Sequence, residues 1–222
     1  LPTIDKELFA PHVPIKYSYL SCPARGCLFD CSYCSLSFLG KEAKRLKGPK
    51  VRQMSVDALI NEIKLHISKY KSPWIDFRQP LMSTNEKWTV EFFARYKEEI
   101  GLPFTTPFRA EFVTEELLIL LKDAGLFMGC MGIECGDENI SKNFLKRGNI
   151  TNSNIIKAFD LFNKYKVKVS STNILALPVK DPLVVDLKTI KLNIRCKPTW
   201  ANFTILIPIP KTEIWKCAIE NN

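Results

Sequence analysis

Short apolar runs alternate with amphipathic helical patterns along almost the whole chain, and this alternation limits its fold more than any other feature. The apolar runs cover residues 17–21, 74–77, 104–108, 127–133, 167–177 and 202–207. About six strand–helix units in alternation predict an α/β fold with a parallel sheet covered by helices. Six such units either close into a partial barrel or lie open as a doubly wound sheet. Strand counting does not separate these two architectures.

Residues suited to helix ends support this alternation. Ser55 and Thr114 are placed to cap helices, because their hydroxyls accept from free backbone N–H groups. Gly125 suits a left-handed helix end, and Pro182 suits a first helical position. The expected helices follow Ser55, Thr114 and Asp181, cover 88–100, 137–145 and 152–166, and include a short one through Trp215.

In both architectures the functional residues gather at the carboxyl ends of the strands. The positions that follow the expected strands are a cysteine-rich loop, Arg78-Gln79, Arg109, Glu134 and Leu177-Pro178. We therefore expect these segments to meet at one end of the sheet.

The loop after the first expected strand reads Cys27-Leu-Phe-Asp-Cys31-Ser-Tyr-Cys34. Three thiolates on one short loop suit three corners of a cubane [4Fe–4S] cluster, which usually takes four protein thiolates. A cluster held by Cys27, Cys31 and Cys34 leaves one iron open for a small-molecule ligand. This arrangement indicates chemistry more than scaffolding.

The alternative for this loop is a four-cysteine zinc site that includes Cys22. Structural zinc sites prefer two CxxC-like pairs separated by a longer loop, whereas these cysteines are compact, so we interpret Cys22 as a strand-end core residue. The other four cysteines are scattered and are expected to be small buried hydrophobic residues: Cys130, Cys135, Cys196 and Cys217.

Composition excludes several classes. The chain has 222 residues, 46% of them hydrophobic and 25% charged, which is ordinary globular usage. No apolar run approaches the roughly 18–20 residues of a membrane-spanning helix. The start lacks the features of a signal peptide, and four cysteines are bunched together, so we expect a reducing cytoplasm. The start also lacks an initiator Met, which suggests a piece of a longer protein.

The net charge is +9, and its sharpest local excess lies at residues 41–52. Charge runs usually face water, so we interpret this segment as a solvated loop, with a basic rim around an anionic site as the alternative. No aromatic interleaving accompanies it, which leaves nucleic-acid binding unsupported.

With Tyr33 before the last cysteine, the cysteine motif resembles the defining motif of the radical S-adenosylmethionine (SAM) superfamily. Further likenesses extend over nearly the whole chain. They comprise Arg109-Ala-Glu-Phe, Asp123-Ala-Gly125, Gly132-Ile-Glu134-Cys-Gly, Lys146-Arg147-Gly, Leu175-Ala-Leu-Pro178 and Pro208-Ile-Pro-Lys-Thr212. The last two are similar to segments of the branch whose members often carry an upstream cobalamin-binding domain. Residues 2–5 resemble the linker to that domain, so we expect a linker at 1–16 and a core domain at 17–222 that lacks its C-terminal extension.

The resemblance implies a partial (β/α)6 TIM-type barrel and a residue-by-residue site. Cys27, Cys31 and Cys34 would hold the cluster, whose open iron would be chelated by the SAM methionine. The other implied roles are Tyr33 near the adenine, Glu134 on the ribose or amino group, Arg147 or Lys146 on the carboxylate, and Arg109 and Thr172 lining the pocket. Reductive cleavage of SAM would then give a 5′-deoxyadenosyl radical that abstracts hydrogen from substrate.

The chain departs from the family pattern at several positions. Arg78-Gln-Pro80 replaces the acidic residue often found after strand two, and Cys135 replaces the serine after Glu134, leaving a thiol close to the implied pocket. Ala176 and Lys211 stand where the pattern has glycine. No Asp-x-His-x-x-Gly cobalamin motif occurs, so any cobalamin would need a domain outside these residues.

The resemblance favours an enzyme of the cobalamin-linked branch that performs C-methylation or skeletal modification. Its partners would be a small-molecule or peptide substrate and a reductant such as flavodoxin or ferredoxin. One alternative is a methylthiotransferase acting on RNA or protein. The other is a non-enzymatic, cysteine-rich metal-binding module for nucleic acid.

Overall fold

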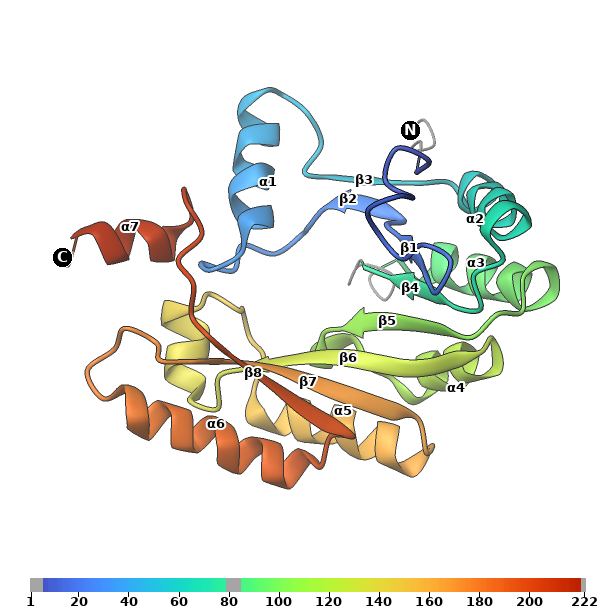
Figure 1. Cartoon of the computed structure of the whole chain (residues 1–222). Coiled ribbons are helices and arrows are strands. Elements are labelled where there is room, and N and C mark those ends of the chain that lie inside the picture. The colour runs from blue at the N-terminus through green and yellow to red at the C-terminus, as the bar shows by residue number, and fades with distance from the viewer. Residues whose placement is uncertain (1–5, 79–84, 221–222) are drawn as a thin grey trace.

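Six parallel strands form the sheet of this computed structural model, which describes residues 6–78 and 85–220 (Figure 1). The strands are β1 (Tyr19–Ser21), β4 (Ile75–Phe77), β5 (Phe104–Phe108), β6 (Leu126–Glu134), β7 (Lys168–Leu175) and β8 (Trp200–Ile205). They pair in the order in which the chain makes them. A doubly wound sheet reverses its strand order partway, so the sequential order decides for the partial barrel, and the predicted α/β class is confirmed.

Helices connect the strands and cover the outer face of the sheet. They are α2 (Val56–Tyr70), α3 (Glu86–Glu99), α4 (Glu115–Asp123), α5 (Asn152–Lys164) and α6 (Pro182–Cys196), with α7 (Glu213–Glu220) after β8. The predicted caps are confirmed: Ser55 accepts from the N–H of Ala58 and Thr114 from that of Leu117. Figure 1 shows α5 and α6 beneath the strands β6–β8.

The two faces of the sheet differ in polarity. On the outer face Phe77 and Phe104 are fully buried and pack edge-on, with ring centres 5.6 Å apart. The residues adjacent to them along the strands point to the opposite face; there Thr105 donates to Asp76 over 2.8 Å. The inner face therefore presents polar groups toward the site.

Two elements were not predicted. β2 (Ala24–Gly26) and β3 (Val51–Gln53) form a two-stranded antiparallel sheet, and α1 (Ser35–Arg45) follows the cysteine loop between them. Both lie on the side of the sheet away from α5 and α6 (Figure 1). The loop interpretation of residues 41–52 was wrong at both ends, because Lys41, Lys44 and Arg45 belong to α1 and Arg52 belongs to β3, although all four are exposed.

The helix expected at 137–145 is present over 138–144, and its main part is a short π-helical segment, Ile140–Phe144. Of the expected linker, residues 6–16 are described, and Lys6 donates to the carbonyl of Leu20 over 2.7 Å. Residues 1–5 and Gln79 lie outside the described residues. Within the described ranges, no helix is long and apolar enough to cross a bilayer.

Candidate functional site

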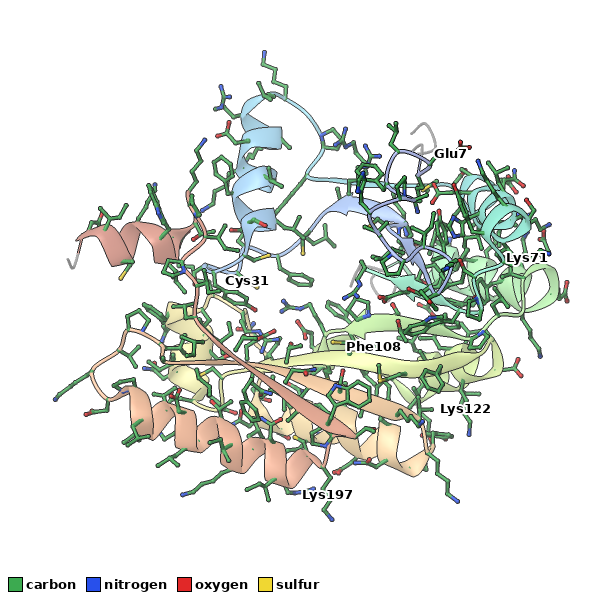
Figure 2. All side chains as sticks on the ribbon, in the orientation of Figure 1. Glu7, Cys31, Lys71, Phe108, Lys122 and Lys197 are labelled. Atoms are coloured by element: carbon green, nitrogen blue, oxygen red, sulfur yellow. The ribbon has the colours of Figure 1, made fainter. Side chains whose placement is uncertain are left out.

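The cysteine loop connects β2 to α1, and contacts of its second half hold it in place. Cys34 is the N-cap residue of α1. Ser32 donates its N–H to the carbonyl of Leu145 over 3.0 Å and its hydroxyl to that of Phe144 over 2.7 Å. Figure 2 shows Cys31 between the base of α1 and the sheet. The loop thus faces the edge of the sheet formed by the carboxyl ends of the parallel strands.

Lys50, just before β3, fixes the first half of this loop. Its Nζ donates to the carbonyl of Leu28 over 2.8 Å and to both carboxylate oxygens of Asp30 over 2.9 Å. These contacts of Lys50 with residues 28–30 could not be predicted from the sequence. The basic run containing it was its only sequence signal.

The three thiols of the loop are free and shielded from water. Cys27 and Cys31 are buried and Cys34 is half-buried. Burial raises the pKa of the Cys27 and Cys34 thiols, and for Cys27 the positive charges of Arg109 and Lys50 oppose the rise. Low-dielectric surroundings disfavour isolated thiolates, so these thiols suit a cationic metal group that compensates their charge.

Glu134 ends β6 in a left-handed backbone conformation. Its φ is +60°, and Thr172 on the neighbouring β7 donates from Oγ1 to Glu134 Oε1 over 3.1 Å. A Cβ on Gly132 would lie 2.4 Å from that same carboxylate oxygen. Burial raises the pKa of Glu134, with the charge of Arg147 opposing.

Arg147 lies close to Glu134, beside Gly132, and is almost fully buried. Its Nη1 donates to the carbonyl of Ile133 over 2.6 Å and its Nη2 to that of Gly132 over 2.7 Å. Its Nε has no hydrogen-bond partner among the described residues. Desolvation lowers the pKa of Arg147, but the nearby Tyr33 and Glu134 outweigh it, so that the pKa is raised.

Tyr33 and Arg109 complete the group. Burial and the Glu134 carboxylate raise the pKa of Tyr33, whose side chain packs against a small apolar cluster around Leu145 and Leu177. Arg109 Nη1 lies 3.8 Å from Cys31 Sγ, and its Nη2 donates to the carbonyl of Arg147 over 2.8 Å. The structure therefore brings together the cysteine loop, Tyr33, Arg109, Glu134, Arg147 and Thr172.

Lys146 is not brought to this group. Its side chain is half exposed and pairs with Glu213 of α7. That ion pair holds the pKa of Glu213 below its usual range, as does the pair with Lys41. Lys146 therefore ties the loop before α5 to α7.

The remaining cysteines divide into three kinds by burial. Cys135 and Cys196 are buried, as predicted, and the Cys135 thiol contacts the carbonyl of Asp137 within the apolar cluster. The core interpretation of Cys22 was wrong, because Cys22 is exposed. Cys130 and Cys217 are half-buried, contrary to the expectation of burial.

Ala176 and Lys211, which stand where the family pattern has glycine, both have positive φ, at 56° and 70°. Non-glycine residues adopt this conformation at a cost of about 1–2 kcal/mol. At these two positions the chain therefore adopts the left-handed backbone conformation that favours glycine, although neither residue is glycine.

The donor set fits a [4Fe–4S] cluster and a nucleoside sulfonium. Three soft thiols on one loop are the ligand type of such clusters. In a cubane each cysteine binds a different iron, so its thiolates lie farther apart than those around a single ion. Within 6–78 and 85–220, no three His, Cys, Asp or Glu side chains are grouped to hold one metal ion. The unpaired Nε of Arg147 and the space kept at Gly132 suit a polar ligand beside the thiols.

A sequence model of the Radical SAM superfamily matches residues 21–182, and the chain belongs to this superfamily. An uncharacterized methyltransferase of Pyrococcus horikoshii is 28% identical over 200 residues, which are 90% of this chain and 41% of that protein. A putative methylthiotransferase of Methanocaldococcus jannaschii is 26% identical over 226 residues, covering 96% of this chain and 47% of that protein.

Among solved structures, the radical SAM methyltransferase TsrM from Kitasatospora setae, with cobalamin and a [4Fe–4S] cluster bound, superposes with a TM-score of 0.75. The identity is 13%, and the match covers 92% of this chain and 37% of that one. The chain thus has the radical SAM fold. It spans less than half the length of these three proteins.

Proposed function

We propose that this chain is the catalytic core of a radical SAM methyltransferase that modifies carbon. The single observation that carries the proposal is the convergence of the three-cysteine loop with Tyr33, Glu134 and Arg147 at one end of the sheet. When bound, the cluster and SAM supply reductive cleavage of the sulfonium to a 5′-deoxyadenosyl radical.

The chain's own residues bind and orient these groups. Cys27, Cys31 and Cys34 would each hold one iron, and Cys22, which is exposed, would take no part, so the fourth iron would stay open. Tyr33 would contact the adenine. Glu134 would accept from the ribose or amino group, with its carboxylate held by the hydroxyl of Thr172.

Arg147 faces the carboxylate of the methionine part. Its buried Nε is the donor left free for that anion, since a buried donor without a partner is costly. Lys146, the other candidate, is engaged by Glu213. Arg109 lines the same pocket on the side of the cysteine loop.

Methyl transfer is supported by the Pyrococcus relative and by TsrM, which are both named methyltransferases. Cobalamin belongs to the proposal because the TsrM structure holds it; it would be bound by a domain outside these residues. The substrate is a small molecule or peptide. The reductant is a flavodoxin or ferredoxin type of carrier in a reducing cytoplasm, where free thiols persist.

The Methanocaldococcus relative favours a methylthiotransferase as the second candidate. That reaction needs a second cluster, and the remaining cysteines are too scattered along the sequence to suggest one. The methyltransferase is therefore the better supported of the two.

The test is release of 5′-deoxyadenosine by anaerobically reconstituted protein given SAM and dithionite. Cys27→Ala, Cys31→Ala and Cys34→Ala each lose the product, whereas Cys22→Ala, matched in chemistry and sequence position, keeps it. Equal loss in Cys22→Ala would show a cluster closed by four thiolates. A colourless protein holding one zinc would support the nucleic-acid module instead.

A further inference from the structure

Arg109 makes contacts in several directions from a buried position at the end of β5. Its side chain is 9% exposed. Nη1 lies 3.8 Å from the Cys31 sulfur, and the guanidinium carbon lies 3.5 Å from the centre of the Phe29 ring. Both of these partners belong to the cysteine loop.

The other contacts of Arg109 reach outside that loop. Nη2 donates to the carbonyl of Arg147 over 2.8 Å, and Nε donates to Glu111 over 2.8 Å. All three guanidinium nitrogens thus have protein partners. The guanidinium of Arg109 thereby joins the cysteine loop to the backbone of Arg147. The five N–H donors of arginine suit it to such a bridge.

A buried cation beside a thiolate sulfur has an electrostatic consequence. Charge-assisted hydrogen bonds stabilise negative charge on the acceptor, and hydrogen bonds to sulfur and net charge set the reduction potential of an iron–sulfur cluster. Reduction adds one electron to the cluster, taking it from the 2+ to the 1+ state. The cation therefore stabilises the reduced state more than the oxidised state.

Glu111 does not cancel this effect. Its side chain is 25% exposed and more open to water than that of Arg109, so solvent screens the carboxylate more than the guanidinium. The Nη1 edge, which faces Cys31, is also the edge that Glu111 does not contact.

We propose that Arg109 is a positioning residue that clamps the cysteine loop and raises the reduction potential of the cluster through its contact with Cys31. This proposal rests on the proposed function. It gives Arg109 a role toward the cluster in addition to lining the SAM pocket. The reducing electron comes from dithionite in the test and from the carrier protein in the cell.

The test is an EPR-monitored redox titration of the reconstituted protein without SAM, which separates the cluster from nucleotide binding. Arg109→Met removes the charge and the donor, and Arg109→Gln removes the charge but keeps an amide donor. The midpoint potential is expected to fall in the order parent, Gln, Met. Arg25→Gln is the control, since Arg25 is exposed two residues before Cys27 and water screens its charge; its potential stays at that of the parent.

Equal potentials in the parent and Arg109→Gln overturn the proposal, as does an equal fall in Arg25→Gln. If Arg109→Met does not retain four irons, the comparison of Arg109→Gln with the parent decides. A parent that holds its cluster but releases no 5′-deoxyadenosine contradicts the proposed function without affecting this order of potentials.

Discussion

Glu134 shows how one strained residue prepares the site. Its φ of +60° costs a non-glycine residue on the order of 1–3 kcal/mol, and such strain gathers at functional sites. The register between β6 and β7 shifts between Gly132 and Glu134, which turns the carboxylate toward Thr172. The sequence placed Glu134 at a strand end, but no local pattern indicated its conformation.

Gly132→Ala tests this geometry. The added Cβ would lie 2.4 Å from Glu134 Oε1 and 3.2 Å from Arg147 Nη2, so both side chains must move. We expect SAM affinity to fall about tenfold or more, a loss of about 1.4 kcal/mol, with the cluster retained. Gly48→Ala is the control, because its Cβ would make only ordinary contact, 3.4 Å from the carbonyl oxygen of Ala43. Unchanged affinity in Gly132→Ala, measured by calorimetry, would remove Glu134 from the SAM site.

His66 provides a pH-dependent contribution to stability. It stacks on Tyr19 with ring centres 3.8 Å apart, and its Nε2 lies 2.9 Å from Ser72 Oγ. Burial and the charge of Lys6 lower its pKa to about 4 from an ordinary 6.5. The unfolded chain therefore binds the proton more tightly than the folded chain between these values.

Stability is consequently full above pH 6.5 and is lost as the pH falls toward 4, at up to about 1.4 kcal/mol per pH unit. We expect His66→Gln to flatten this dependence in urea unfolding at pH 5 and pH 7. His12→Gln, at an exposed site, leaves it unchanged. An equal slope in His66→Gln and the parent would contradict the shift.

The two-stranded β2–β3 sheet and α1 are the elements that bracket the cysteine loop. Neither was predicted, because Ala24–Gly26 and Val51–Gln53 contain no apolar run that would reveal a strand, and a basic run is typical of a solvated loop. Gly26 shows how tightly this small sheet is built: with φ at +92°, its Cβ would lie 2.0 Å from the Lys50 carbonyl oxygen.

Lys50→Met tests whether the residue just before β3 holds the loop. Met keeps an apolar stem against Gly40 but removes the bonds to Leu28 and Asp30. We expect a chelator to extract iron several-fold faster than from the parent. Lys47→Met, an exposed lysine in the same segment, is the matched control. Identical extraction rates in both variants would mean that Lys50 does not restrain the loop.

The alternation of apolar runs with amphipathic helical patterns predicts the overall fold. The place of the site follows from the parallel arrangement of the strands. Apolar periodicity was enough to predict the six strand–helix units and the parallel pairing of the strands. A parallel sheet in turn predicts functional residues at the carboxyl ends of the strands. The side-chain contacts were not: Arg109 and Cys31 are 78 residues apart, and no local pattern joins them. Lys146 and Arg147 are neighbours in sequence, yet the Lys146 side chain is exposed and the Arg147 side chain is buried. The backbone between these two side chains has a positive φ at Lys146.

The central claim is that the polypeptide holds three irons of a cubane and leaves the fourth to SAM. The most direct measurement is the EPR spectrum of the dithionite-reduced, reconstituted protein with and without SAM, together with its iron content. We expect about four irons per chain and a spectrum that changes when SAM is added. A spectrum that SAM leaves unchanged, or a single zinc in place of iron, would contradict the claim.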